Sequence, residues 1–563
     1  MLNQFTYSLP QELESAVHAK VEEFKKLQTI KRIWEKDASV WTNTDEANWL
    51  GWLEIVAREL GDLQKYSDIA ADSKNFQDIV LLGMGGSSLC PEVFSITFDK
   101  QNFHVLDSTV PAQIKTLEGK IDLAKTLFIV ASKSGSTLEP NTFKQYFYER
   151  VSETIGVDHA GTKFVAITDP GSKLEAIAKQ EGFRHIFYGD PTVGGRFSAL
   201  TVFGLIPAAA MQIDVEAFLK SANEMVEACK SDLPYENPGA FLGTILGVCH
   251  AAGRDKLTIF TSPEIYDVGA WLEQLIAEST GKNGVSIIPI DRETIQEADK
   301  YGDDRIFAYL KLGGFDSSGT DQMVSRIEQS GQPVVRINLA EKTSLGQEFF
   351  RWEFATAVAG AILEINPFNQ PDVESAKIEA KKITSAYEKT GALPEEKPFY
   401  EENGIKLFTD DANLAELKEA AFEENPLATY IKSHFARIKK GDYFALLAYI
   451  EMNSENEKLL QDVRHEVLKN HSVATCLGFG PRFLHSTGQG YKGGDNNGVF
   501  LQITSEEAED FIVPGQKYTF GVVKSAQARG DFQVLLDRKR RALRIHLSAD
   551  VAEDLELLKE IIS

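Results

Sequence analysis

Short apolar, β-branched runs alternate with amphipathic stretches along most of the chain after residue 75. Four such runs, each followed by a helical pattern, predict strands in the first half, at 78–82, 103–106, 127–131 and 164–168. A second series predicts further strands, at 257–261, 286–290, 306–310, 334–339, 473–477, 499–503 and 543–547. Such alternation is typical of right-handed βαβ units, which build parallel sheets. The pattern therefore predicts an α/β protein whose parallel sheets are flanked by helices.

The remaining segments indicate the domain organisation. Residues 1–66 are predicted to form an N-terminal helical segment, because 10–66 show charged helical faces with scattered tryptophans. Two α/β domains then follow, over 67–235 and 236–563, and they meet near Pro234 and Pro238. Residues 372–425 are charged and helical, with a polar loop in the middle, which predicts a helical elaboration of the second domain.

Charge and cysteine content narrow the classes of partner. The 563 residues carry 83 acidic against 59 basic side chains, a net charge of −24, which argues against nucleic acid or an anionic membrane as the main partner. The first residues show no signal-peptide pattern, and the longest apolar run, 199–213, is too short to span a bilayer. Four cysteines in no metal or disulfide spacing, and no HExxH motif, predict a cytoplasmic protein without a metal site.

Residues 132–140 (SKSGSTLEP) follow a predicted strand and lead into a helical pattern. Free backbone N–H groups at a helix start and the helix dipole favour an anion there. Ser132, Ser134, Ser136 and Thr137 add hydroxyl donors, and Lys133 adds a cation. A capped turn would explain one hydroxyl residue but hardly four with a lysine. The loop therefore predicts a site for a phosphate-type ligand.

The first strand runs into GMGGSSLCP at 83–91, which is similar to the glycine fingerprint of dinucleotide-binding proteins. Asp107 ends the next strand, where a ribose-binding acid would sit, so a dehydrogenase is one alternative. However, Ser88 replaces the third glycine of that fingerprint. The second hydroxyl-rich loop at 132–137 favours one compact phosphorylated ligand over a dinucleotide.

Two further stretches offer catalytic side chains. Arg196, in GGRFS at 194–198, is interpreted either as part of a buried structural ion pair or as a fixed cation that faces a developing oxyanion. Glu278 lies near the end of a largely apolar helical pattern, WLEQLIAEST, and Gln274 shares its helix face at i−4. Glu278 is either an ordinary surface acid or a candidate general base.

The last candidates lie far along the chain. NPFNQP at 366–371 opens a helical pattern that carries Gln370 and Lys377, which lie seven residues apart on one face. His485 lies in a glycine-rich loop, GFGPRFLHSTGQGYKGG, after a predicted strand. A loop of this kind is costly to order without a purpose, although a lone histidine there also fits a turn residue.

Together these motifs resemble those of the glucose-6-phosphate isomerase family, whose fold contains two sugar-isomerase (SIS) domains. The set comprises GMGGSSLCP, SKSGSTLEP, GGRFS, QLIAESTGK, NPFNQPDVESAK and LHSTGQ. It covers most of the chain from about residue 75 and is most similar to the isomerase half of fused transaldolase–isomerase proteins. The resemblance implies a cytoplasmic homodimer without a cofactor that interconverts glucose 6-phosphate and fructose 6-phosphate, with its site in the cleft of the two SIS domains.

The resemblance also implies roles for single residues. It implies that Glu278 moves a proton through a cis-enediol, that Arg196 stabilises the charge of that intermediate, and that His485 and Lys377 assist ring opening. The implied substrate-binding residues are Gly86, Ser87, Ser132, Lys133, Ser134, Thr137, Gln274 and Gln370.

The sequence also departs from the family pattern. In the usual family pattern the histidine precedes the NPF motif, whereas His485 follows it, an order that the fused proteins share. Which subunit of the dimer supplies this histidine stays open. Cys90 and Asn369 replace a usual Gly and Asp. The remaining alternatives are a dual phosphoglucose/phosphomannose isomerase and a non-catalytic sugar-phosphate-binding SIS protein. A mere sensor needs only the phosphate loops, so Glu278, Arg196 and Lys377 together argue against it.

Overall fold

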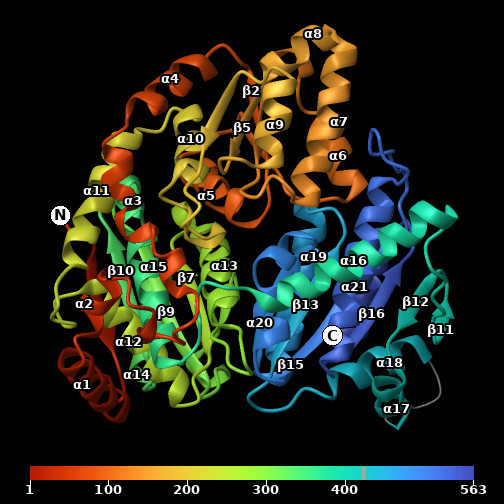
Figure 1. The fold of residues 1–563 in the computed structure, drawn as a ribbon. Coiled ribbons are helices and arrows are strands. Elements are labelled where there is room, and N and C mark those ends of the chain that lie inside the picture. The colour runs from red at the N-terminus through yellow and green to blue at the C-terminus, as the bar shows by residue number, and fades with distance from the viewer. Residues whose placement is uncertain (420–425) are drawn as a thin grey trace. The chain divides into compact units, whose positions relative to one another are not determined.

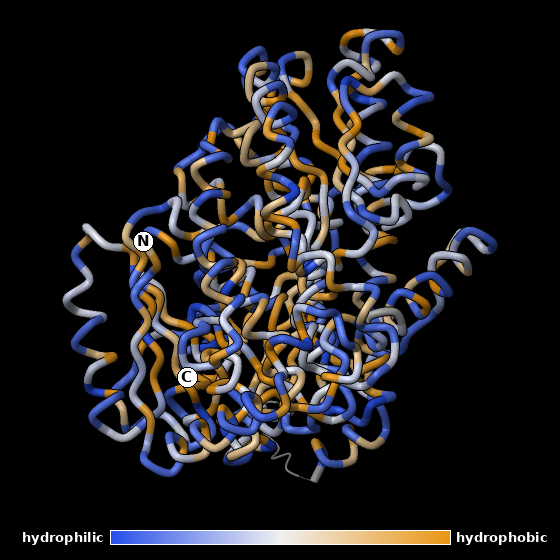
Figure 2. The backbone as a smooth tube through the Cα atoms, turned by 60° about the vertical axis from the view of Figure 1, so that its left-hand side comes forward, coloured by the Kyte–Doolittle hydropathy of each residue, from blue (hydrophilic) through white to orange (hydrophobic). Residues whose placement is uncertain are grey.

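The computed structural model describes residues 1–419 and 426–563. The chain divides into two compact units, each with its own hydrophobic core. Unit 1 comprises residues 1–107, 117–298 and 304–369, and unit 2 comprises residues 108–116, 299–303 and 370–563. The colouring in Figure 2 shows that hydrophobic segments lie mainly inside the trace, while hydrophilic loops lie mainly at its periphery.

The first sheet of unit 1 has the strand order β3-β2-β4-β5-β6, and all its pairs are parallel. Figure 1 labels two of its strands, β2 and β5. Its strands are β2 (Asp78–Leu82), β3 (Phe103–Leu106), β4 (Thr126–Ala131), β5 (Phe164–Thr168) and β6 (His185–Tyr188). The four strands predicted from the sequence are confirmed. Strand β6 was not predicted, because it is a short edge strand in which no residue is fully buried.

The second sheet of unit 1 has the order β1-β10-β9-β7-β8. Its strands are β1 (Gln4–Ser8), β7 (Lys256–Thr261), β8 (Ile288–Asp291), β9 (Arg305–Leu312) and β10 (Val334–Leu339). Strand β1 pairs antiparallel with β10, Gln4 opposite Asn338, so the prediction of an all-helical N-terminal segment is wrong for these residues. The alternation of Phe5 and Tyr7 with polar residues was the available signal.

Helices surround both sheets of unit 1, and a single core joins them. The helices are α1 (Gln11–Lys26), α2 (Thr29–Trp34), α3 (Trp52–Leu60), α4 (Gln64–Ser73), α5 (Leu89–Thr97), α7 (Leu138–Ile155), α8 (Val157–Ala160), α9 (Lys173–Gln180), α10 (Val202–Ala210), α11 (Val215–Ala228), α12 (Pro238–Ala251), α13 (Val268–Thr280), α14 (Ser318–Gln329) and α15 (Leu345–Ile362). Trp52 of α3 stacks on Phe197 with ring centroids 5.3 Å apart, so the N-terminal helices are an integral part of this core.

Unit 2 contains a third sheet with the order β11-β12-β16-β15-β13-β14. Strands β14, β13, β15 and β16 are parallel, and the hairpin of β11 and β12 adds antiparallel to β16. The strands are β11 (Tyr400–Glu402), β12 (Ile405–Phe408), β13 (Tyr443–Tyr449), β14 (Ala474–Phe479), β15 (Gly498–Ser505) and β16 (Arg541–Leu547). The structure thus corrects the prediction of one domain over 236–563, because the later strands pair only with one another.

The helices of unit 2 flank this third sheet. They are α16 (Pro371–Thr390), α17 (Asp411–Glu419), α18 (Pro426–Phe435), α19 (Ser454–His471), α20 (Gly488–Gly493), α21 (Phe520–Asp537) and α22 (Val551–Ile562), and most of α6 (Pro111–Glu118) also falls in this unit. The predicted elaboration at 372–425 contains α16, the β11–β12 hairpin and α17, and its last residues, 420–425, lie outside the described residues.

No helix in residues 1–419 or 426–563 combines the length and the apolar character needed to cross a bilayer. Within the same described residues, no group of three or more His, Cys, Asp or Glu side chains is arranged to hold a metal ion. All four cysteines are buried free thiols.

Candidate active site

The first glycine-rich loop follows β2 and forms a short 3-10 helix, Gly85–Ser87. A β-carbon at Gly86 would overlap the carbonyl of Gly195, so glycine is required where these two segments of unit 1 meet. Ser88 donates a hydrogen bond of 2.9 Å to the Asp107 carboxylate. Asp107 therefore stabilises the loop internally, and this contact does not support the ribose-binding role of the dehydrogenase alternative.

The second loop, at 132–137, follows β4 and precedes α7, as the sequence predicted. The side chain of its N-cap residue, Thr137, makes no capping hydrogen bond to α7. The Ser132 hydroxyl is buried and donates to the Thr137 hydroxyl across 3.3 Å. Ser134 and Ser136 are exposed, and their hydroxyl oxygens lie 2.9 Å apart. The loop therefore combines hydroxyl groups with a helix start that lacks a side-chain cap, which is the arrangement that favours an anion.

Lys133, which the sequence indicated only as a cation of the loop, forms an ion pair within unit 1. Its ammonium lies 2.6 Å from the Asp169 carboxylate and donates to the Asp190 carbonyl at 2.8 Å. Burial raises the pKa of Asp169, and the neighbouring Lys133 opposes that rise. Lys133 thus ties the loop to the segments that follow β5 and β6, and any contact with a ligand would be in addition to this ion pair.

Arg196 is buried in the short 3-10 helix Gly195–Phe197. Its Nε donates to the Ser279 hydroxyl at 2.7 Å, and its Nη2 donates to the carbonyls of Pro367 and Asn369 at 2.6 and 3.0 Å. Burial lowers the pKa of the Arg196 guanidinium, whereas the negative charge of Glu278 raises it. Because these contacts fix the guanidinium, it presents a preorganised positive charge.

Glu278 lies in the last turn of α13 and is only 8% exposed, so its interpretation as an ordinary surface acid is wrong. Arg196 Nη1 lies 3.3 Å from Glu278 Oε1, and Gln274 donates to Oε2 across 3.1 Å. The i and i+4 spacing on α13 explains the contact of Gln274 with Glu278. The result is a buried carboxylate held by one cation and one amide.

Sequence reasoning missed two neighbours of this pair, Lys282 and Ser279. The Lys282 ammonium is buried and donates to the backbone carbonyls of Glu278 and Ser279 at 2.9 and 2.7 Å. It therefore caps the carboxyl end of α13, where a cation is favoured by the helix dipole. The motif EST-G-K contained both residues, but only tertiary contacts reveal their function as supports.

The remaining candidates lie in unit 2. Gln370 is the N-cap residue of α16, Lys377 is an exposed residue of the same helix, and His485 ends the short 3-10 helix Arg482–His485 and is partly buried. Within this unit, Gln489 of α20 accepts from the Asp372 backbone at 2.9 Å and donates to its carboxylate at 2.8 Å. That two-point contact fixes the start of α16 to α20, which follows the histidine loop, and no local pattern along the chain predicted it.

The structure thus brings Gly86, Arg196, Gln274 and Glu278 into one neighbourhood of unit 1, through the contact of Gly86 with Gly195. Gln370, Lys377 and His485 belong to unit 2. The predicted roles of these three residues, and the predicted cleft, stay predictions.

Comparison with known proteins finds similarity to one family. A family model described as phosphoglucose isomerase matches residues 64–297, which contain every candidate of unit 1. The probable glucose-6-phosphate isomerase of Methanococcus maripaludis is 28% identical over 368 residues, covering 58% of this chain and 82% of that protein. The glucose-6-phosphate isomerase of Parabacteroides distasonis is 28% identical over 386 residues, covering 59% and 86%.

Solved structures support the fold. A hypothetical protein from Thermus thermophilus superposes with a TM-score of 0.59 at 23% identity, covering 67% of this chain and 99% of that chain. A glucose-6-phosphate isomerase from Chlamydia trachomatis gives a TM-score of 0.52 at 20% identity, covering 64% and 78%.

The parallel sheets flanked by helices and the two loops at their strand ends define an α/β protein of the sugar-isomerase fold. The chain is similar to the glucose-6-phosphate isomerase family, through the family model that matches residues 64–297 and through relatives that are 28% identical. The matches do not favour a dual-specificity isomerase or a non-catalytic binding protein. The closer similarity to fused transaldolase–isomerase proteins stays a prediction.

Proposed function

We propose that this protein interconverts glucose 6-phosphate and fructose 6-phosphate. Glu278 takes the proton from C2 of the open-chain aldose and returns it to C1, and the reverse reaction uses the same steps. A cis-enediol is the intermediate, so a single carboxylate on one face of the substrate suffices for both proton transfers. The reaction requires no organic cofactor, since no electrons leave the substrate.

The observation that carries this proposal is the buried Glu278 carboxylate beside the fixed Arg196 guanidinium, 3.3 Å apart. Negative charge develops on the substrate oxygens as the enediol forms, and a preorganised cation lowers the free energy of that state. Gln274 holds the second carboxylate oxygen and so limits the rotation of the base. A general base must be held within hydrogen-bond reach of the proton that it removes.

The phosphate group is proposed to bind at the 132–137 loop. Ser132, Ser134 and Thr137 supply hydroxyl donors, and the start of α7 supplies backbone N–H groups. Gly86 and Ser87 complete the binding surface, while Lys133 holds the loop in shape through Asp169. Binding energy from this distant group positions the reacting carbons at Glu278.

His485 and Lys377 are proposed to open the pyranose ring, and Gln370 to contact the sugar. Ring opening needs an acid and a base separate from Glu278, because the proton moves on the ring oxygen and not on carbon. We further propose a cytoplasmic homodimer, whose oligomeric state is measurable by sedimentation equilibrium.

Mixing two inactive variants tests whether the dimer shares its sites. If Glu278 and His485 of one site come from different subunits, a mixture of Glu278→Gln and His485→Ala dimers recovers about a quarter of wild-type activity, since one site in four is then complete. No recovery after confirmed subunit exchange means that each subunit supplies both residues.

The central experiment is a coupled assay with pure protein. Fructose 6-phosphate is the substrate, and glucose 6-phosphate is detected through a dehydrogenase. We expect turnover that the Glu278→Gln variant loses; absence of turnover in the folded wild-type protein would refute the isomerase proposal. The same assay with mannose 6-phosphate tests the dual-specificity alternative.

A further inference from the structure

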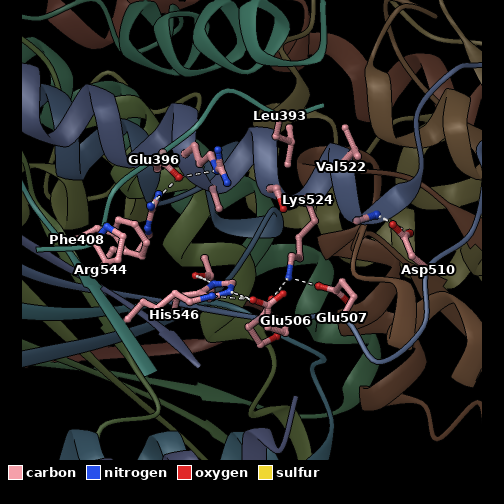
Figure 3. Close-up of a pocket in the computed structure, with 18 of the residues that line it drawn as sticks. Leu393, Glu396, Phe408, Glu506, Glu507, Asp510, Val522, Lys524, Arg544 and His546 are labelled. Carbon is pink, nitrogen blue, oxygen red and sulfur yellow. Dashed lines mark hydrogen bonds and ion pairs between the residues drawn. The ribbon is translucent and has the colours of Figure 1, made fainter. Parts of the chain in front are cut away.

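Unit 2 contains a pocket of about 520 Å³ at the carboxyl end of β15 (Figure 3). Its walls come from the segment after α16, the β11–β12 hairpin, the end of β15, the first turns of α21 and β16. The volume lies within the range of small-molecule sites. Ligands of open α/β sheets also bind at the carboxyl ends of parallel strands. Neither the proposed isomerase residues nor the residues matched by the family model line this pocket.

One end of the pocket carries two arginines that share a single carboxylate. Glu396 lies 2.7 Å from Arg529 Nε and accepts from Arg544 Nη2 at 2.9 Å. Arg529 also donates to the carbonyl of Pro394 at 2.8 Å. Two positive charges therefore face one negative charge, and this end retains a net positive charge that suits an anion.

The position of Arg544 is fixed before any ligand arrives. Its guanidinium carbon lies 4.3 Å from the ring centroid of Phe408 and 5.3 Å from that of Phe532. Burial lowers the pKa of Arg544, so the protein holds this cation at a cost in desolvation free energy. A cation fixed between two aromatic rings loses little side-chain entropy when it binds a ligand.

The remainder of the pocket is richer in carboxylates than in positive charges. The Lys524 ammonium donates to the Ser505 carbonyl at 2.9 Å and pairs with Glu507, while His546 contacts Glu506 at 3.2 Å. Burial raises the pKa of Glu507 and lowers the pKa of His546. This region thus offers carboxylate oxygens, which accept hydrogen bonds from hydroxyl groups.

We propose that this pocket is a second small-molecule site and that it binds a polyhydroxylated anion, namely a phosphorylated or carboxylated sugar. The anionic group contacts Arg529 and Arg544, and the hydroxyl groups contact Glu506 and Glu507. Inorganic phosphate alone is a poor match, because four Lys and Arg residues and five Asp and Glu residues line the pocket as a whole. The site is independent of the proposed isomerase activity.

The pocket lies beside the contact of α16 with α21. Leu393 and Glu396 follow the end of α16, and Arg529 comes from α21. The two helices pack closely, since a β-carbon at Gly530 of α21 would lie 2.7 Å from the Ala380 nitrogen of α16. The wall of the pocket at this end is therefore held by the packing of two helices.

Calorimetric titration of the full-length protein with 6-phosphogluconate tests the site. We expect a binding phase that Arg529→Gln weakens at least about tenfold, the loss expected for one charge-assisted contact. Arg529 is the first choice because its side chain is 25% exposed and tolerates substitution better than the buried Arg544. Arg544→Gln, checked for folding by circular dichroism, should weaken the same phase.

Three controls give each outcome a meaning. Lys458→Gln removes one exposed positive charge of unit 2 outside the pocket and should leave binding unchanged. Gluconate separates carboxylate from phosphate recognition, and inorganic phosphate should bind at least about tenfold more weakly than 6-phosphogluconate. Binding that is unaffected by Arg529→Gln, or equally weakened by Lys458→Gln, overturns the proposal.

The same variants separate this site from the isomerase site. Arg529→Gln should leave turnover and KM for fructose 6-phosphate unchanged. Thr137→Ala should weaken only binding at the 132–137 loop. A titration in which Thr137→Ala removes all binding refutes the second site but not the isomerase, whereas absent turnover with a persistent Arg529-dependent phase refutes the isomerase alone.

Discussion

Two of the buried arginine–glutamate pairs in unit 1 differ in geometry. Two guanidinium nitrogens of Arg305, in β9, donate to the Glu293 carboxylate at 2.9 and 3.2 Å. Arg305 also donates to the Thr258 hydroxyl. Arg196 approaches Glu278 with one nitrogen at 3.3 Å, while its other nitrogens bind Ser279 and two backbone carbonyls. The bidentate pair neutralises both charges in place. The looser pair fixes the cation separately and leaves the carboxylate less strongly held, as a base that must accept a proton requires.

The largest expected effect belongs to the bidentate pair. Glu293→Gln leaves the buried Arg305 guanidinium without its counter-charge and should lower the free energy of unfolding by ~3–5 kcal/mol. Turnover per folded molecule should stay at the wild-type value. Urea denaturation, combined with the coupled assay, measures both quantities. A stable variant with impaired turnover would contradict the structural assignment of this pair.

Glu278→Gln should have the opposite effect, which is lost turnover in a protein that still folds. The amide keeps the size of the side chain but cannot accept the substrate proton, so turnover should fall roughly a hundredfold or more. Binding of a competitive sugar-phosphate inhibitor should persist, because the phosphate loop is unchanged. Steady-state kinetics and equilibrium binding provide the measurements. Wild-type turnover in this variant would show that another group is the base.

A matched pair of arginine variants sharpens the comparison. Arg196→Lys keeps a positive charge but loses the guanidinium that spans Ser279, Pro367 and Glu278, so turnover should fall about tenfold or more. Arg305→Lys should lower the melting temperature with little effect on turnover. If both variants affect only stability, Arg196 has no role in the chemical step.

The smallest effect is expected at the phosphate loop. Ser134→Ala removes one exposed hydroxyl, so KM for fructose 6-phosphate should rise severalfold with turnover unchanged, as for a contact made equally in ground and transition states. Ser152→Ala is the control, because that hydroxyl donates to the Tyr148 carbonyl within α7. Equal KM values for the two variants would remove Ser134 from the binding surface.

Local patterns alone determined much of the fold. The buried strands β2, β4 and β5 are continuous apolar runs, and each predicted strand of the first sheet was confirmed. The glycine-rich and hydroxyl-rich loops were found because their composition is unusual directly after a strand. The candidate pair of Gln274 and Glu278 followed from helical spacing.

Tertiary structure decided what depends on contacts between distant residues. An apolar run specifies a strand but not its sheet, so the separate sheet of β13 to β16 and the pairing of β1 with β10 could not be read locally. The ion pair of Arg196 with Glu278 joins residues more than 80 positions apart, and so does the hydrogen bond from Arg196 to Ser279. The sequence by itself thus determined most of the strands, the two loops after strands of the first sheet, and the candidate residues. The tertiary structure alone decided which carboxylate is buried beside a cation, because burial results from packing and not from local pattern.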